Sequence, residues 1–184
     1  MKHRISSLLL TGIFLLCAGC GAPAASGAAE PASLQFFSMD TVMSITAYGE
    51  QGQAGVQAAR EAVNRLDGLL SRTDPDSQIS QLNAHAGDGT AVEVEPDVAE
   101  LLSFAQSVSH LLPGDFDITI APVMDAWGFT TEERHVPTEQ ALSAALALVD
   151  STQLEVDGDA STARLLQAGM EVDLGAVAKG FAAG

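Results

Sequence analysis

The arrangement of apolar and polar positions along the chain predicts helices separated by extended segments. Apolar residues recur every three or four positions from about 54 to 70, the spacing of an amphipathic helix. A second apolar stripe follows Pro96 and stops at Pro113-Gly114, and a third helix is expected over 138–149. These patterns predict three helices that each turn one face toward a core.

Extended segments are predicted by runs of β-branched and aromatic residues. Residues 34–48 alternate loosely and indicate one or two strands, and 154–156 and 163–166 indicate a hairpin around Asp157-Gly158-Asp159. Residues 170–174 are expected to form the last strand. Helices and strands mix without a regular βαβ period, so the expected fold class is α+β, a mixed sheet packed with helices and incomplete at the C-terminus.

The connecting segments are expected to be short or irregular. Residues 71–89 are polar, with room for one helical turn at 79–83. Residues 115–119 read as an extended piece or a turn, after which Pro122 can open a helical turn that Gly128 closes.

The N-terminus reads as an export signal. Basic residues at 2–4 precede the apolar run 8–16, which is too short to span a bilayer. Residues 16–21 resemble a bacterial lipobox, which predicts a signal peptide at 1–19, lipidation of Cys20 and a flexible linker over 20–33. The protein would then be lipid-anchored at the extracytoplasmic face of the cell membrane. A plain secretory leader with incidental cysteines is the alternative.

The charge of the chain excludes one class of partner. The formal net charge is -16, and nucleic-acid binding needs clustered Lys and Arg, so a nucleic-acid partner is not expected. Such an acidic surface favours cations, and a bound phosphate would need a local positive charge or a metal.

The end of the chain supplies such a charge. Met170 to Leu174 leads through Gly175 into an Ala-rich helical pattern that contains Lys179, and Lys2 is the only other lysine. Main-chain N–H groups and a helix dipole at this junction would suit an anion. From these residues alone, an ordinary strand-to-helix corner stays an equal alternative.

Four segments taken together resemble one known family, the ApbE family. They are Met39-Asp40-Thr41, residues 70–83, residues 115–119 with Pro122 and 127–129, and residues 173–180. Members are extracytoplasmic flavin transferases that move FMN from FAD onto a threonine of a target protein. The resemblance implies that residues 34–184 are the N-terminal part of a flavin transferase domain.

The resemblance also implies roles for particular residues. The FAD-binding positions would be Met39, Thr73, Asp115, Phe116, Asp117, Asp173 and Lys179. Met39 would contact the flavin, Phe116 would form an aromatic wall and Asp117 would accept hydrogen bonds from ribityl or adenosine groups. Thr73 stands where relatives often have a stacking tyrosine, and Asp40 stands where glycine is usual. Trp127 and Phe129 are expected to be core residues behind the wall.

The resemblance further implies a metal. Ala176 aligns with a Mg²⁺ ligand and could serve only through its carbonyl oxygen. The other ligands, an Asp and a Thr, and a catalytic histidine are expected beyond Gly184, so the catalytic residues are unknown and the 184 residues alone are expected to be poor catalysts. Three histidines of the mature chain, His85, His110 and His135, match no motif and are expected at the surface or at helix ends.

The function expected from the resemblance is Mg²⁺-dependent transfer of FMN from FAD to a threonine of a flavoprotein subunit of a membrane redox complex, with release of AMP. Two alternatives stay open. One is an FAD-binding or FAD-hydrolysing lipoprotein without a protein target. The other is a solute-binding lipoprotein that performs no chemistry.

Overall fold

The computed structural model describes residues 30–131 and 133–184. The strands are β1 Ala32–Ser38, β2 Thr41–Ala47, β3 Val92–Glu93, β4 Leu154–Asp157 and β5 Thr162–Leu165. The helices are α2 Gly52–Leu70, α3 Gln78–Ala84, α4 Pro96–Leu111, α5 Ala121–Ala126, α6 Glu139–Leu146 and α7 Ala178–Ala183, with a 3-10 turn η1 at Ser151–Gln153. The predicted α+β class is confirmed; the strands form two small antiparallel sheets. Cys20 and the predicted signal peptide lie outside the described residues.

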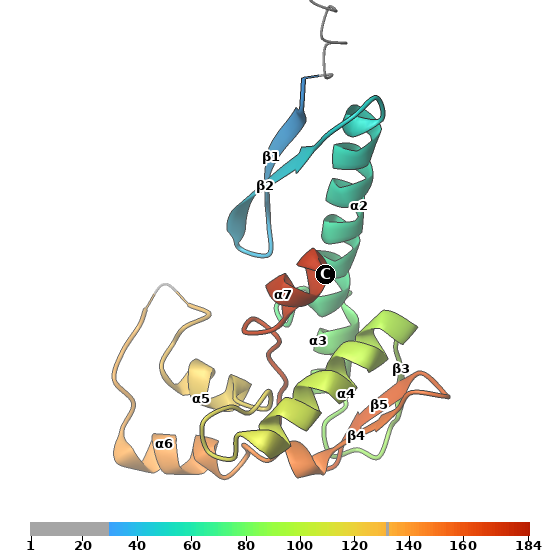
Figure 1. Ribbon diagram of the computed structural model, residues 1–184. Coiled ribbons are helices and arrows are strands. Elements are labelled where there is room, and N and C mark those ends of the chain that lie inside the picture. Colours follow the sequence, from blue (N-terminus) through green and yellow to red (C-terminus); the bar gives the residue numbers. More distant parts are fainter. Residues whose placement is uncertain (1–29, 132) are drawn as a thin grey trace, which may run out of the picture.

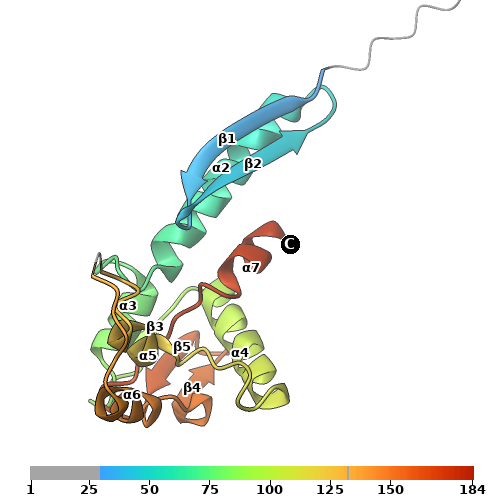
Figure 2. The same cartoon turned by 90° about the vertical axis from the view of Figure 1, so that its left-hand side faces the viewer.

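Strands β1 and β2 form a hairpin that lies along α2 (Figures 1 and 2). Ser38 pairs with Thr41, so the connecting turn consists of Met39 and Asp40, both with positive φ, 49° and 55°. Positive φ at both central residues is the backbone of a type I′ turn, which matches the twist of a hairpin. Asp tolerates this left-handed conformation, and the tight turn therefore forms without a glycine at position 40.

The predicted amphipathic helices are confirmed, with small shifts at their ends. Helix α2 buries Val56, Val63, Leu66 and Leu70, which is the stripe that its periodicity predicts. The third helix is shorter than predicted. Thr138 caps α6 by accepting a hydrogen bond from Ala141 N, but after Leu146 the chain continues in tighter i to i+3 turns.

The core lies at the C-terminal end of α2. There α3 and α4 pack against the three-stranded sheet β3-β5-β4 (Figure 2). Its largest fully buried side chains include Ile79, Leu82, Leu101, Leu102, Leu165 and Met170. Full burial of each such side chain stabilises the fold by roughly 1.5–3 kcal/mol. This core fixes the segments that carry the candidate site.

The predicted strand at 170–174 is wrong. Its strand pairing is an isolated parallel bridge between Glu171 and Ile120, although Asp173 N also donates to Ile118 O at 2.8 Å. The Asn83 side chain forms hydrogen bonds with both main-chain groups of Val172. Asn83 Nδ2 donates to the Val172 carbonyl oxygen at 3.0 Å, and Val172 N donates to Asn83 Oδ1 at 2.7 Å. An amide side chain thus occupies the place of a neighbouring strand.

Candidate functional site

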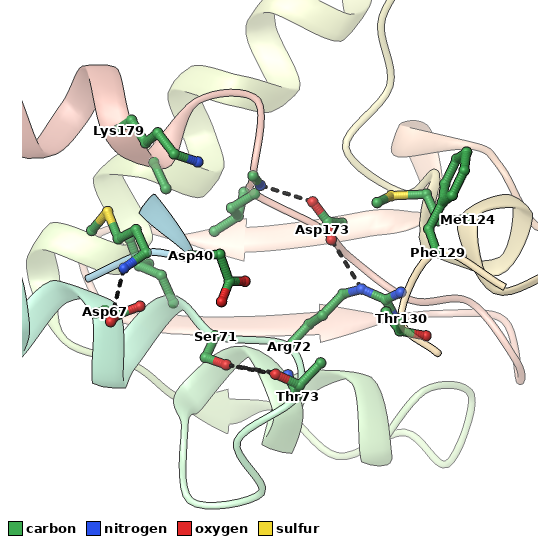
Figure 3. A pocket seen from close by; sticks show the side chains of 15 residues that line it. Asp40, Asp67, Ser71, Arg72, Thr73, Met124, Phe129, Thr130, Asp173 and Lys179 are labelled. Atoms are coloured by element: carbon green, nitrogen blue, oxygen red, sulfur yellow. Dashed lines mark hydrogen bonds and ion pairs between the residues drawn. The ribbon is translucent and has the colours of Figure 1, made fainter. Parts of the chain in front are cut away.

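Two adjoining cavities lie where the closing segment meets α2, α5 and the loops. The hairpin cavity, about 230 Å³, includes Met39, Asp40, Asp67, Arg72, Thr73, Phe129 and Lys179 in its lining (Figure 3). The loop cavity, about 580 Å³, includes Asp115, Phe116, Asp117, Leu146, Val149 and Ala176. Met124, Asp173 and Gly175 line both, so the two cavities share a wall.

The structure brings the residues implied by the family resemblance to these two cavities. Met39, Thr73 and Lys179 line the hairpin cavity; Asp115, Phe116, Asp117 and Ala176 line the loop cavity; Asp173 lines both. They come from segments that are far apart along the chain. Their roles toward a ligand stay predictions.

Asp67 of α2 holds the Met39 end of the hairpin cavity. Its Oδ2 accepts hydrogen bonds from Ser38 Oγ at 2.9 Å and from Met39 N at 3.0 Å. A single carboxylate oxygen therefore ties the hairpin turn to the helix. Sequence reasoning missed Asp67, since nothing in the polar face of an amphipathic helix distinguishes one acid from its neighbours.

Arg72 lines the hairpin cavity, and sequence reasoning missed it as well. Its side chain is 9% exposed. It pairs with Asp125 at 2.6 Å and with Glu171 at 3.3 Å. Its Nε also pairs with Asp173 Oδ2 at 2.9 Å, as Figure 3 shows. Burial alone lowers the pKa of the Arg72 guanidinium, but the hydrogen bond to Asp125 and the three negative charges outweigh burial and raise that pKa.

The carboxylates around Arg72 respond in opposite directions. Burial pushes the pKa of Asp125 upward, yet the hydrogen bond and the charge of Arg72 hold it below its ordinary value. For Glu171, burial and the nearby charge of Asp125 raise the pKa, and the more distant guanidinium does not compensate. Three carboxyl groups thus surround one guanidinium beside the hairpin cavity.

Asp117 is used mainly within the chain. Its Oδ1 accepts from Thr119 N at 2.8 Å and Thr119 Oγ1 at 2.7 Å, and its Oδ2 accepts from Ser151 N at 3.0 Å. A carboxylate has about four acceptor sites. Asp117 thus shapes the loop cavity by joining two loops, and most of the capacity predicted for ribityl or adenosine groups is already occupied.

The closing segment differs from the predicted amide cradle. Gly175 N donates to Asp173 Oδ1 at 2.8 Å, and the N–H groups of Val177 and Ala178 both donate to Leu174 O. These amides are therefore satisfied internally, because a turn at 175–177 precedes α7 and the helix does not begin directly after Gly175. Lys179 is exposed and has no ion pair within the described part of the chain.

Trp127 and Phe129 are not core residues, which corrects the sequence-based expectation. Phe129 is 52% exposed and lines the hairpin cavity, and its ring stacks on Trp127 with centroids 6.3 Å apart. Helix α5 ends at Ala126, and Gly128, with positive φ, turns the chain back over the helix end, so Phe129 does not enter the core. An aromatic residue directly after a helix-ending glycine was the sequence signal that could have identified Phe129 as a cavity residue.

The remaining predictions concern histidines and metal. His85, His110 and His135 are all exposed, and two of them lie at helix ends, as predicted. Among residues 30–131 and 133–184 no group of three or more His, Cys, Asp or Glu side chains could hold a metal ion. Ala176 is exposed and has only a main-chain carbonyl oxygen to offer, so the described residues by themselves do not fit a Mg²⁺ site. Within the same ranges, no helix is long and apolar enough to cross a membrane.

Comparisons with known proteins agree with one another. The sequence model of the ApbE family matches residues 39–184. The chain is 29% identical to the FAD:protein FMN transferase of Haemophilus influenzae, over 98% of this chain and 54% of that protein, and 32% identical to that of Treponema pallidum, over 92% and 49%. The ApbE protein structure from Thermotoga maritima has a TM-score of 0.76 at 26% identity, covering 83% of this chain and 50% of the other. The chain thus spans about half the length of these relatives.

Proposed function

Because the chain belongs to the ApbE family of flavin transferases, we propose that it forms the FAD-binding part of an enzyme that moves FMN from FAD to a threonine of a target flavoprotein. The observation that supports this proposal is the convergence of Met39, Thr73, Asp173 and Lys179 on one cavity and of residues 115–117 on the adjoining one. FAD is an elongated molecule with two ring systems, and two cavities with a common wall suit its shape.

Electrostatics favour Lys179 as the phosphate contact. The chain carries a net charge of -16, and the guanidinium of Arg72 is already surrounded by carboxylates. A diphosphate in the hairpin cavity would therefore depend on the exposed ammonium of Lys179 for its local positive charge. In the proposed reaction the threonine oxygen bonds to the FMN phosphorus, the bond from that phosphorus to the bridging oxygen breaks, AMP leaves and the hydroxyl proton is released.

Magnesium dependence is part of the proposal. The carbonyl oxygen of Ala176, on the wall of the loop cavity, is the ligand that this part of the chain would contribute. Mg²⁺ requires near-octahedral oxygen coordination, so further ligands from elsewhere are needed.

The activity is tested with the full-length product of the gene, FAD, Mg²⁺ and a flavoprotein subunit that carries a threonine acceptor. Flavin fluorescence that stays on the denatured acceptor supports transfer. Release of FMN and AMP into solution, without labelling, supports the hydrolase alternative. Binding of FAD without either product supports a binding protein, and absence of FAD binding contradicts the proposal.

Lys179→Ala tests the phosphate contact. Loss of one charge-assisted hydrogen bond, worth roughly 1.5–3 kcal/mol, should weaken FAD binding by about tenfold or more. Lys179→Arg should retain most of the affinity. Arg164→Ala serves as a matched control, because Arg164 pairs with Glu155 on the β4–β5 hairpin and lines neither cavity. Unchanged affinity in Lys179→Ala would remove the assigned role.

Membrane anchoring through Cys20 also belongs to the proposal. It rests on the lipobox-like run at 16–21 and the short apolar run before it. Cys20→Ala should abolish incorporation of labelled fatty acid and move the protein out of the membrane fraction. Cys17→Ala is the matched control and should change neither. Absence of fatty-acid labelling in the natural protein would contradict lipidation and favour a plain secretory leader.

A further inference from the structure

Phe129 is an exposed aromatic residue with an unexplained position. It is 52% exposed, and it is the aromatic side chain among the described residues that line the hairpin cavity. Its ring stacks on Trp127 with an interplanar angle of 17°. An aromatic ring that is supported from behind and exposed beside a cavity offers a flat apolar face for a ligand ring.

The backbone holds Phe129 in this position. Gly128 has φ +70°; its N–H donates to Asp125 O at 2.9 Å, and Phe129 N donates to Met124 O at 3.0 Å. These are the two hydrogen bonds of a Schellman helix end, which characteristically brings the residue after the glycine against the last turn of the helix. Thr130 adds a hydrogen bond from Oγ1 to Asp125 Oδ1 at 3.1 Å. The ring is therefore placed before any ligand arrives.

The other walls of the cavity suit the remainder of a flavin nucleotide. In Figure 3, Asp173 lies between Phe129 and Lys179, so the aromatic wall and the free positive charge occupy different sides of the cavity. Met124 lies beside Phe129 and adds a polarizable sulfur. Thr73, also in the lining, has no ring, so stacking at this cavity cannot come from that residue.

From this arrangement we propose that Phe129 is the stacking platform for the isoalloxazine ring of FAD, with the phosphates directed toward Lys179. The inference rests on the proposed FAD binding and adds a specificity-determining residue to it. Phe129 acts on ligand affinity and on ring placement, and it takes no part in bond breaking.

The test compares FAD affinity, by isothermal titration calorimetry, across substitutions of Phe129 in the full-length protein. Phe129→Leu keeps an apolar side chain without a π face and should weaken FAD binding about three- to tenfold, the range typical of an aromatic pair. Phe129→Tyr should restore the affinity. Phe104→Leu is the matched control, because Phe104 is 58% exposed on α4 and does not line the hairpin cavity; its affinity should stay within twofold.

A second measurement separates stacking from a structural effect. The absorption bands of bound FAD should shift on stacking in the natural protein and in Phe129→Tyr, and the shift should disappear in Phe129→Leu. If the natural protein binds FAD and Phe129→Leu binds it equally well with an unchanged spectrum, the inference is wrong while the proposed function stands. If the natural protein does not bind FAD, both are wrong.

Discussion

At the scale of single residues, the charge of the site depends on how one guanidinium is shared. Arg72 faces Asp125, Glu171 and Asp173, and its contact with Glu171, at 3.3 Å, is the longest of these ion pairs. The short contact from Nε holds Asp173, whose other oxygen binds Gly175 N. Arg72 therefore positions Asp173, the carboxylate that lines both cavities. Glu171 has the longest contact with the guanidinium, so its negative charge is stabilised least by Arg72.

The raised pKa of Glu171 predicts a pH-dependent stability effect. A folded-state pKa above the unfolded value means that the folded protein binds this proton more tightly, so the stabilisation is complete below the unfolded value and is lost as pH rises through the folded value. Glu171→Gln lacks this loss. We expect its free energy of unfolding, relative to that of the natural protein, to increase as the pH rises above the ordinary glutamate pKa of about 4.3. Urea denaturation at several pH values measures the difference, and a constant difference would contradict it.

At the scale of elements, the end of α5 decides which side chains reach the hairpin cavity. Helix α5 spans Ala121–Ala126, and the chain reverses at Gly128. The proline near its start and the glycine after its end are both visible in the sequence and predict its limits well. The destination of Phe129 is not visible, because it depends on what the reversed chain packs against.

Gly128→Ala should therefore disturb both stability and binding. A Cβ at this position would lie 2.5 Å from Glu133 O, and φ +70° is unfavourable for alanine. We expect a loss of roughly 1–2 kcal/mol in the free energy of unfolding, from the left-handed backbone alone, and weaker FAD binding as Phe129 moves. Gly158→Ala is the matched control, since a Cβ there meets nothing within 4 Å, and it should change stability by less than about 0.5 kcal/mol. Equal effects in the two variants would contradict the argument.

At the scale of the whole molecule, the closing segment is held by side chains and loops instead of a sheet. Asn83 of α3 binds both main-chain groups of Val172, and Asp173 N binds Ile118 O. These contacts connect α3, the 115–119 loop and the closing segment into one unit. The position of Asp173 and Gly175 in the wall shared by the two cavities consequently depends on these hydrogen bonds.

Asn83→Leu should be strongly destabilising for its size. It leaves the part-buried N–H and C=O of Val172 without their partner, at a cost of about 2–3 kcal/mol in the free energy of unfolding. Gln81→Leu, on the exposed side of the same helix, should have an effect below about 1 kcal/mol, because Gln81 makes an exposed hydrogen bond to Asp76 O. Urea denaturation compares them, and similar losses in both would show that Asn83 has no special part in the connection.

Local sequence features decided the elements whose causes lie within a few residues. The apolar stripe of α2, Pro96 at the start of α4 and Gly128 after α5 each act through neighbouring backbone and side chains, so their patterns predict the structure directly. The family resemblance likewise pointed to the residues that meet at the two cavities, since it rests on motifs that are contiguous in sequence.

Only the tertiary structure decided what lies between those motifs. Arg72 finds partners 53 and 99 positions away, and the run 170–174 became a side-chain-bound segment although its composition favours a strand. Such outcomes depend on which segments the folded core brings within hydrogen-bonding distance, and no local periodicity records that. For the same reason Phe129, an apolar residue that the sequence alone would bury, lies exposed at the cavity, because the turn at Gly128 directs it there.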